Sequence, residues 1–201
     1  MFALVQCCCA QDEGVKTADI VDSVLVAGDR GTFAAPILRA SKDQPLGLRL
    51  EAFSAHGPAF IASVATAVDT AVGYYNAKAP ERARIRAGDY IVAVGGKTAV
   101  REMRRLMDAW RIDFSIRRPL LYTVPVHKKG RPFGLWLKYD CGGTALTINA
   151  VDAAGAAADV GEALMRGDRI VRVNGVAGSI EALLAEIRRS QDVLLTVSRC
   201  P

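Results

Sequence analysis

The sequence predicts an α+β fold in which one strand-rich unit occurs twice, and two observations lead to this prediction. Three short motifs recur along the chain at offsets of 79, 81 and 87 residues. Between them, apolar and polar residues alternate as in half-buried strands, or apolar residues recur at the spacing of one helix face. The chain of 201 residues is therefore expected to divide into a tail (1–33), a first unit (34–119) and a second unit (120–201).

The composition is that of a chain able to bury a core. Hydrophobic residues make up 51% and charged residues 23% of the sequence, which excludes wholesale disorder and fibrous classes. No apolar stretch approaches the roughly 18 residues of a membrane-spanning helix. The net charge of +5 falls short of a nucleic-acid-binding run, and the two histidines are isolated. We therefore expect neither nucleic acid nor a metal or other cofactor.

The tail carries three adjacent cysteines, Cys7, Cys8 and Cys9. No Lys or Arg precedes the short apolar run at its start, as a secretory signal would require, so we expect a cytoplasmic protein. The cysteines have two interpretations. They are free thiols on a flexible tail, or they are S-acylated and associate the protein with a membrane, which two acyl chains can do. A short helix is expected near Asp19 or Asp22.

Each unit has an apolar-Gly-apolar loop followed by a strand. The loop reads Pro45-Leu46-Gly47-Leu48 in the first unit and Pro132-Phe133-Gly134-Leu135 in the second. In the strands that follow, the alternate leucines share one face, and Arg49 and Trp136 lie on the other.

A further strand in each unit follows a Gly-Asp turn. Residues 85–96 and 164–175 both run apolar-x-x-Gly-Asp-x-Ile-Val-x-Val-x-Gly, with Asp89 and Asp168 in the turns. The first unit has about eight more residues ahead of this motif, which we place within 66–84 as a surface insertion. Because the aspartates recur within a structural motif, we do not pair them as catalytic carboxylates.

A helix and a last strand complete each unit. The helices are expected after the N-cap residues Thr98 and Ser179. The final strands, 113–118 and 194–199, match at an offset of 81. The residues that share one helix face are Ala99, Met103 and Leu106 in the first unit and Ile180, Leu183, Leu184 and Ile187 in the second.

The order and spacing of these motifs resemble the PDZ domain family, twice. The loops match that family's carboxylate-binding loop, Gly-apolar-Gly-apolar, with proline in place of the first glycine. The second unit keeps the family's Gly-Asp-x-Ile-x-x-Val-Asn-Gly signature at 167–175, whereas Gly95 replaces the Asn in the first unit. The resemblance implies that each unit is a small, mostly antiparallel, partly open β-barrel or sandwich with two helices.

The resemblance also implies an interaction scaffold or adaptor that binds the C-terminal tails of other proteins by β-augmentation. The tail would lie between the strand after the glycine loop and the second helix, with its terminal carboxylate on the N–H groups of the loop. The peptide-binding residues implied are Leu46, Gly47, Leu48, Leu50, Ala99, Met103 and Leu106 in the first unit. In the second unit they are Phe133, Gly134, Leu135, Leu137, Ile180, Leu184 and Ile187.

Charge and pocket chemistry then suggest which tails would bind. The apolar walls predict an apolar last residue, and in this family the first residue of the second helix sorts the ligand residue two positions before the end. Ala99 and Ile180 predict an apolar residue there too. Cations that would support the carboxylate are Lys42 in the first unit and Lys128, Lys129 and Arg131 in the second, each with solvated surface charge as its alternative.

Other functions compete with this one. Catalysis is not expected, because the sequence contains no Gly-x-Ser-x-Gly elbow, P-loop or His-Glu-x-x-His motif. The first unit, with its insertion and small Ala99, could have lost its groove and serve only to pack against the second. A peripheral membrane module would bind anionic lipid through basic helix faces, together with an acylated N-terminus. Those faces are formed by Arg101, Arg104, Arg105, Arg111, Arg117, Arg118, Arg188 and Arg189.

Overall fold

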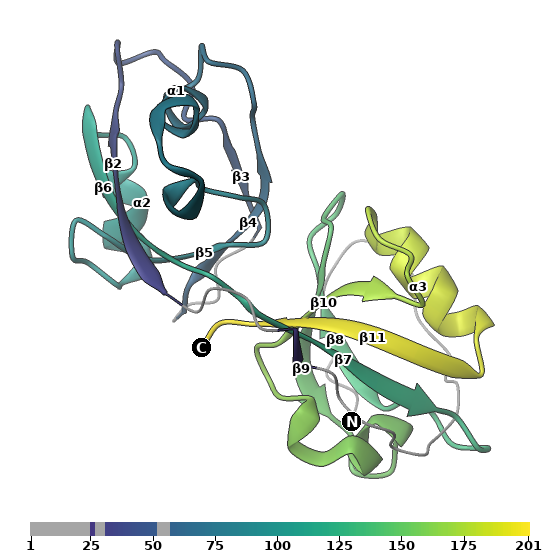
Figure 1. The fold of residues 1–201 in the computed structure, drawn as a ribbon. Helices are drawn as coiled ribbons and strands as arrows, with labels where there is room; N and C mark the ends of the chain where they lie inside the picture. The colour runs from purple at the N-terminus through teal and green to yellow at the C-terminus, as the bar shows by residue number, and fades with distance from the viewer. Residues whose placement is uncertain (1–24, 27–30, 52–56) are drawn as a thin grey trace. The chain divides into compact units, whose positions relative to one another are not determined.

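A computed structural model describes residues 25–26, 31–51 and 57–201 of the chain (Figure 1). These residues form two compact units, and the chain passes from one to the other between Pro119 and Leu120. Each unit combines an antiparallel sheet with separate helices. The predicted α+β class is therefore confirmed.

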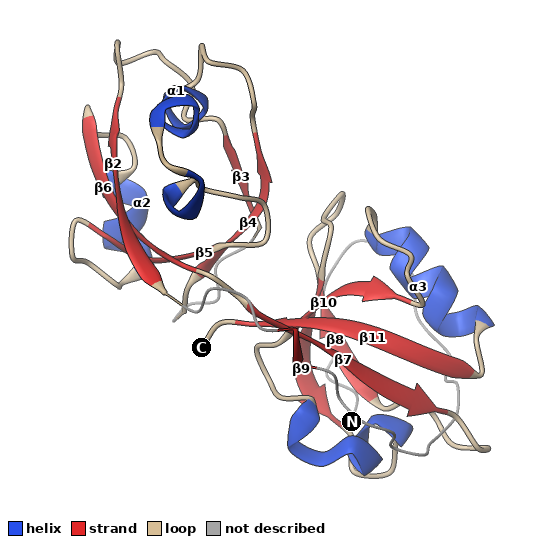
Figure 2. Ribbon diagram, in the orientation of Figure 1, coloured by secondary structure: helices blue, strands red, loops and turns tan. Residues whose placement is uncertain are grey.

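The first unit contains a five-stranded sheet with the order β2-β6-β5-β4-β3. Because β2 and β3 do not pair with each other among the described residues, the sheet is open between them. Helix α1 lies between these two edge strands (Figure 2). The strands are β2 (Thr32–Leu38), β3 (Leu48–Leu50), β4 (Ala59–Val64), β5 (Tyr90–Val94) and β6 (Arg111–Arg117). The helices are α1 (Ala71–Lys78), the 3-10 helix η1 (Glu81–Ala83) and α2 (Val100–Leu106).

The second unit repeats the order of the strands, has one 3-10 helix in place of α1 and η1, and adds one short strand at the edge of its sheet. Its order is β1-β7-β11-β10-β9-β8. The strands are β1 (Leu25–Val26), β7 (Leu120–His127), β8 (Leu135–Lys138), β9 (Leu146–Val151), β10 (Arg169–Val173) and β11 (Asp192–Arg199). The helices are the 3-10 helix η2 (Ala156–Ala163), which is interrupted at Gly161, and α3 (Ile180–Arg189).

Each unit buries its own apolar core, and the strand alternation read from the sequence decides which side chains enter it. In β6, Ile112, Phe114 and Ile116 are buried while the residues between them are more exposed. In β11, Leu195 and Val197 are buried in the same way. Full burial of such a side chain contributes roughly 1.5–3 kcal/mol, so the alternation fixes the register of each sheet.

The tail contributes a strand where a helix was expected. Leu25 and Val26 form β1 and pair antiparallel with Tyr122 and Leu121 of β7. The short helix was expected to start near Asp19 or Asp22, which lie outside the described residues, so only Leu25 and Val26 are seen to depart from it. Cys7–Cys9 lie outside the described residues, so their acylation is still a prediction. β2 begins at Thr32, two residues before the expected start of the first unit.

The equivalent strands β2 and β7 each carry a proline. Arg39 and Lys128, just after β2 and β7, donate their backbone N–H groups to the residue preceding the last strand, at 3.0 Å in both units. Since hydrogen-bonding positions alternate along an antiparallel ladder, Pro36 and Pro125 face away from β6 and β11. A proline there removes no ladder bond and limits further strand pairing.

Helix α1 lies within 66–84, the range in which the extra residues of the first unit were expected. Helix α1 begins after Thr70, whose hydroxyl accepts a hydrogen bond from the backbone N–H of Gly73 at 3.1 Å. The first turn is buried, and a Cβ on Gly73 would lie 2.0 Å from the carbonyl oxygen of Ala67. Glycine is therefore required at this point of close packing.

The two helices after the Gly-Asp strands begin differently. Ser179 caps α3 as predicted, accepting a hydrogen bond from the N–H of Ala182 at 3.2 Å. The prediction that Thr98 caps α2 was wrong. The N-cap is Ala99, which provides no side-chain hydrogen bond, and the helix begins at Val100.

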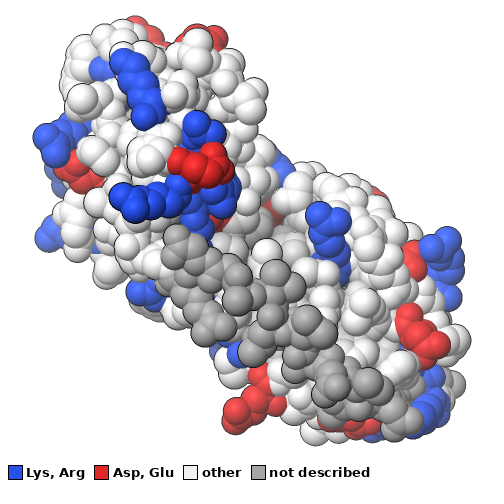
Figure 3. All heavy atoms as spheres, viewed as in Figure 1, with Lys and Arg blue, Asp and Glu red and all other residues white. Residues whose placement is uncertain are grey.

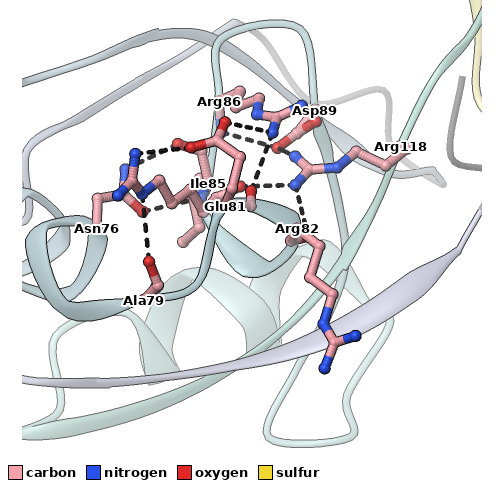
Figure 4. A network of polar contacts seen from close by, with 9 residues as sticks. Asn76, Ala79, Glu81, Arg82, Ile85, Arg86, Asp89 and Arg118 are labelled. Atoms are coloured by element: carbon pink, nitrogen blue, oxygen red, sulfur yellow. Dashed lines mark hydrogen bonds and ion pairs between the residues drawn. The ribbon is translucent and has the colours of Figure 1, made fainter.

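The aspartate of each Gly-Asp turn anchors the last strand of its unit, and Figure 4 shows this anchor in the first unit. Asp89 accepts a hydrogen bond from the backbone N–H of Arg86 at 2.8 Å and forms a buried ion pair with Arg118. Arg118 also donates to two backbone carbonyls at the end of η1, at 3.0 and 2.8 Å. Burial raises the pKa of the Asp89 carboxyl above its ordinary value of 3.8, although the hydrogen bond from Arg118 opposes this.

The second unit repeats this anchor with one more partner. Asp168 accepts hydrogen bonds from the backbone N–H of Met165 at 2.8 Å and from the guanidinium of Arg199 at 2.7 Å. The hydroxyl of Tyr122 adds a third at 3.2 Å. Both turn aspartates are thus occupied by structural contacts.

Candidate functional site

The glycine loops adopt a conformation that only glycine accepts readily. Gly47 and Gly134 have φ angles of +84° and +76°, in the region that a Cβ disfavours. A Cβ on Gly47 would lie 2.5 Å from the hydroxyl of Thr70, and one on Gly134 would lie 2.4 Å from the Cα of Gly155. Each loop is therefore held against the start of the next helix of its unit, α1 in the first and η2 in the second.

The carbonyl groups of each loop are hydrogen-bonded to that helix. In the first unit, the N–H groups of Ala71 and Val72 donate to the carbonyls of Pro45 and Leu46, both at 3.0 Å. In the second unit, residues 156 and 157 donate to the carbonyls of residues 132 and 133, at 2.8 and 2.9 Å. These bonds turn the carbonyls toward the helix in both units.

The N–H groups of the loops have no hydrogen-bond acceptor in the part of the chain that the structure describes. Among the described residues, no hydrogen bond is recorded for the N–H of Leu46 or Gly47, nor for that of Phe133 or Gly134. Consecutive N–H groups around a residue of positive φ form a concave site suited to an anion. Each loop is therefore a candidate site for a carboxylate.

The strand after each loop has an open edge. β3 and β8 end their sheets and pair on one side only within the described residues, with β4 and β9. The residue before each strand is in a hydrogen-bonded pair, because Ala65 donates to Gly47 and Asp152 donates to Gly134, at 2.8 and 2.9 Å. The alternation of the ladder then directs the backbone groups of Leu48 and Leu135 toward the open edge.

The strand residues predicted to bind peptide lie on the core side of these edges. Leu46, Leu48 and Leu50 are half-buried and pack against the core of the first unit. In the second unit, Phe133 is buried, and Leu135 and Leu137 are half-buried against the second core.

The helix residues predicted for the first unit need a correction. Ala99 is the exposed N-cap, so Val100 is the first helical residue and the counterpart of Ile180. Met103 is fully buried in the core. Leu106 contacts the turn after β5, since a Cβ on Gly95 would lie 3.2 Å from its side chain. The helix starts one residue later than expected. The residues that correspond to Ile180, Leu184 and Ile187 of the second unit are therefore Val100, Arg104 and Met107.

The helix residues predicted for the second unit share one face of α3. Ile180 and Ile187 are buried in the core, and Leu184 is half-buried beside it. In both units the half-buried leucines of the edge strand and the apolar residues of the second helix thus pack against a single core cluster.

A cation lies at the end of the second helix in each unit. In the second unit Lys128 is buried, and its Nζ donates to the carbonyl of Ile187 and lies 5.8 Å from the ring centroid of Phe133 in the loop. In the first unit Arg39 donates to the carbonyls of Met107 at 2.9 Å and Gln44 at 3.1 Å.

Arg39 was missed by the sequence interpretation, which named Lys42 instead. Arg39 Nε is buried without a hydrogen-bond partner in the described residues, whereas Lys42 is exposed. The signal was present in the sequence, since Pro36 and Arg39 have the same spacing as Pro125 and Lys128. Of the other predicted cations, Arg131 pairs with Asp159, and Lys129 is exposed with contacts of its own.

The basic helix faces are smaller than predicted. Arg118 does not belong to them, because it is buried against Asp89. Arg189 forms an ion pair with Glu186, and Arg111 is paired with a carboxylate of its own strand at 3.0 Å. On the face shown in Figure 3, Lys and Arg side chains stand in several separate groups with acidic or uncharged residues between them.

Membrane-spanning helices and metal-binding clusters are both absent from the described residues. None of the helices in the described part of the chain is both long and apolar enough to cross a bilayer. Within the same residues, no three His, Cys, Asp or Glu side chains are placed to hold a metal ion.

Comparison with known proteins finds similarity to solved structures only. No family model matches the chain, and no curated protein matches it. A solved complex of INAD PDZ45 with NORPA CC-PBM is 18% identical, covers 85% of this chain and 92% of that chain, and has a TM-score of 0.36. INAD PDZ45 in complex with NG2 peptide is 19% identical, covers 86% of this chain and 91% of that chain, and has a TM-score of 0.35.

Proposed function

We propose that the protein is a peptide-binding adaptor in which β3 and β8 each accept the extended C-terminal tail of a partner protein as an added strand. One observation carries the proposal. In both units the loop carbonyls are bonded to the helix behind them, while within the described residues the adjacent N–H groups have no acceptor and no further strand pairs with β3 or β8. This is the recognition mode that the PDZ resemblance of the sequence implies.

The loop supplies the part of the site that recognises the end of a chain. A terminal carboxylate can accept hydrogen bonds from the N–H groups of Leu46, Gly47 and Leu48, which follow one another through the residue of positive φ. Hydrogen bonds to a charged group contribute about 1.5–3 kcal/mol each. An internal peptide segment has no carboxylate at this position, so the loop favours a true C-terminus.

Arg39 and Lys128 reinforce this preference in the proposal. Each donates to the last carbonyls of the second helix, where the helix dipole is negative, and each lies beside a glycine loop. A positive charge held at this place stabilises an anion bound to the neighbouring N–H groups. The unpartnered Nε of Arg39 supports the idea that this guanidinium still has bonding capacity in the unbound protein.

The apolar side chains that face the same core set the expected ligand sequence. Leu48 and Leu50, or Leu135 and Leu137, present half-buried surface to the last ligand residue, which we expect to be Val, Leu, Ile or Phe. The first helical residues, Val100 and Ile180, are apolar and lack the hydrogen-bonding group that would select Ser or Thr. An apolar residue two positions before the end is therefore still expected.

A titration followed by nuclear magnetic resonance tests the proposal on the full chain. A short peptide ending in Val with a free carboxylate is added, and the same peptide with a C-terminal amide is the matched control. The amide signals of Leu46, Gly47, Leu48 and Leu135 should shift with the free acid. The amidated peptide should bind roughly ten-fold more weakly or worse, because it loses the charged acceptor. Equal binding of both peptides, or shifts remote from both loops, would contradict the proposal.

Two substitutions in the first unit separate the supporting cation from ordinary surface charge. Arg39→Met should weaken peptide binding at the first loop by roughly five- to ten-fold, while Lys42→Met should leave it within error of the wild type. Binding at the second loop serves as an internal control in the same sample. A larger effect of Lys42→Met than of Arg39→Met would show that the supporting cation has been assigned wrongly.

A further inference from the structure

We propose that the two strand edges select different residues at the penultimate position of a bound tail: an acidic residue on β3 and an aromatic or large apolar residue on β8. This inference rests on the proposed function and names the partner chemistry of each edge. The observations that carry it are the positions of Arg49 and Trp136, which occupy equivalent places in the two strands.

The register of an added strand follows from the loop. If the terminal carboxylate accepts hydrogen bonds from the loop, the last ligand residue lies opposite Leu48 or Leu135. An antiparallel ligand then places its penultimate residue opposite Arg49 or Trp136. Residues directly opposite each other in a sheet project to the same face, so the penultimate side chain meets the side chain of Arg49 or Trp136.

The pairing geometry brings these side chains close together. The backbone groups of Leu48 and Leu135 face the open edge, so those of Arg49 and Trp136 face the neighbouring strand. The pair that each forms with a ligand residue is therefore the non-hydrogen-bonded kind, in which the two Cα atoms lie about 4.5 Å apart and the side chains are nearest. The penultimate residue is thus the ligand position most exposed to the chemistry of the edge strand.

Both side chains are exposed, and Arg49 also has a contact of its own within the protein. On the neighbouring strands, Arg49 lies opposite Ser63 and Trp136 lies opposite Ala150, and both of these partners are small and exposed. Trp136 is 37% exposed although its own unit has an apolar core available. A ligand aromatic ring beside Trp136 would cover apolar surface that is now in contact with water.

The two preferences differ in physical origin, which makes them separable. A guanidinium paired with an exposed carboxylate is screened by salt, whereas aromatic contact is not. Lys138, exposed two residues beyond Trp136 on β8, disfavours a basic residue on that edge. Cross-strand pairs of these kinds contribute enough to change affinity by roughly 1.5- to five-fold.

The test uses the full chain and three short peptides that end in Val and differ only in a penultimate Glu, Phe or Ala. Affinities are measured separately at the two edges from the amide signals of Leu48 and Leu135. At Leu48, the Glu peptide should bind roughly two- to five-fold more tightly than the Ala peptide, and high salt should remove the difference. At Leu135, the Phe peptide should bind more tightly than the Ala peptide by a similar factor that salt leaves unchanged.

Substitutions assign each preference to its residue. Arg49→Glu should reverse the preference of the first edge, so that a peptide with penultimate Lys binds more tightly than one with Glu. Arg101→Glu makes the same charge change on α2 and should leave that preference in place. Trp136→Ala should remove the advantage of Phe at the second edge without altering the affinity of the Ala peptide.

The outcomes distinguish this inference from the proposed function. If none of the peptides shifts the signals of either edge, the proposed function fails and the preference falls with it. If the peptides bind in a carboxylate-dependent way but both edges rank them alike, the preference is overturned and the proposed function stands.

Discussion

The two units share their ladder of strands but hold the second helix against the preceding turn in different ways. In the second unit, Asn174 occupies the turn after β10 with a φ of +49°, and its amide donates to Glu186 of α3 at 2.9 Å. Its side-chain oxygen accepts from the N–H of Leu194 at 2.7 Å. The same residue thus connects a turn, a helix and the last strand.

The first unit replaces this polar connection with an apolar one. Gly95 occupies the equivalent turn with a φ of +54°, and a Cβ placed on it would meet the half-buried side chain of Leu106 of α2. Leu106 occupies the helix position that Glu186 has in the second unit. The turn residue and the helix residue therefore differ as a pair: Asn with Glu in the second unit, Gly with Leu in the first. The turn has the same backbone conformation in both units, and only the contact that joins it to the helix differs, polar in the second unit and apolar in the first.

The largest expected effect concerns the anchor that the units share. Asp89→Ala should destabilise the first unit by about 3–5 kcal/mol, because it leaves the charge of Arg118 buried and unpaired. Asp168→Ala should cost the second unit less, since Arg199 is more exposed, at 23% of its side-chain surface against 7% for Arg118. Urea unfolding with signals resolved for each unit measures both losses. An equal loss in the two units would show that the exposure of the arginine does not decide the cost.

Exchanging the turn residues is expected to have the next largest effect. Asn174→Gly should destabilise the second unit by about 1–3 kcal/mol, because the buried Glu186 loses a donor, although glycine accepts the backbone conformation. The same unfolding measurement applies.

The reverse exchange is the matched control. Gly95→Asn should also destabilise the first unit, since Leu106 offers no hydrogen bond and a Cβ would lie 3.2 Å from it. Stabilisation of the first unit by Gly95→Asn would mean that its apolar solution is not adapted to glycine.

The helix caps provide a smaller test of the same contrast. Ser179→Ala should destabilise the second unit by about 1 kcal/mol, because the N–H of Ala182 loses its acceptor. Ala99→Ser places a capping hydroxyl at the start of α2 and should stabilise the first unit by up to about 1 kcal/mol. Circular dichroism during thermal unfolding detects both changes, and a loss of stability in Ala99→Ser would contradict the equivalence of the two positions.

The smallest expected effect is on how the stability of each unit changes with pH in the acid range, where Asp89 and Glu186 should act in opposite directions. Burial raises the pKa of Asp89 above 3.8, so the folded first unit holds this proton more tightly than the unfolded chain. The contribution of Asp89 to stability therefore falls as pH rises from about 3.8 through the folded pKa.

Glu186 should behave in the opposite way. Hydrogen bonds from Ser190 and Asn174 lower the pKa of Glu186 below 4.5, so its contribution to the second unit is complete above pH 4.5 and is lost as pH falls through the folded pKa. Unfolding measured between pH 3 and 6 tests both signs, with Asp89→Asn and Glu186→Gln as the variants in which each dependence should disappear. If the contributions of Asp89 and Glu186 changed in the same direction with pH, the opposite pKa shifts assigned to them would be refuted.

Most of the fold could be predicted because the repeat showed each element twice. The strand alternation around Leu48 and Leu135 and the helix face of Ile180 and Ile187 match the observed burial. These patterns record which side chains face a core, and burial is the strongest term in folding.

The parts that could not be predicted depend on a one-residue shift in the alignment of the two units or on contacts between residues far apart in the sequence. The offset between the helices is 80, since Val100 corresponds to Ile180, and no motif in the sequence marks this position. A one-residue error in the helix start rotates the expected face by roughly 100°. Ala99 and Met103 were therefore named where the structure places Val100 and Arg104. The role of Arg39 could not be derived from its neighbours alone, because it depends on the carbonyl of Met107, which is 68 positions away.

The short strand β1 has a consequence for how the chain assembles. Leu25 and Val26 precede the first unit in the sequence, but they pair with Leu121 and Tyr122, which follow it. A ribosome therefore delivers the whole first unit before the partner of β1 emerges, so this pairing must form late in synthesis. A truncation at residue 120, drawn to isolate the second unit, would remove a strand from its sheet.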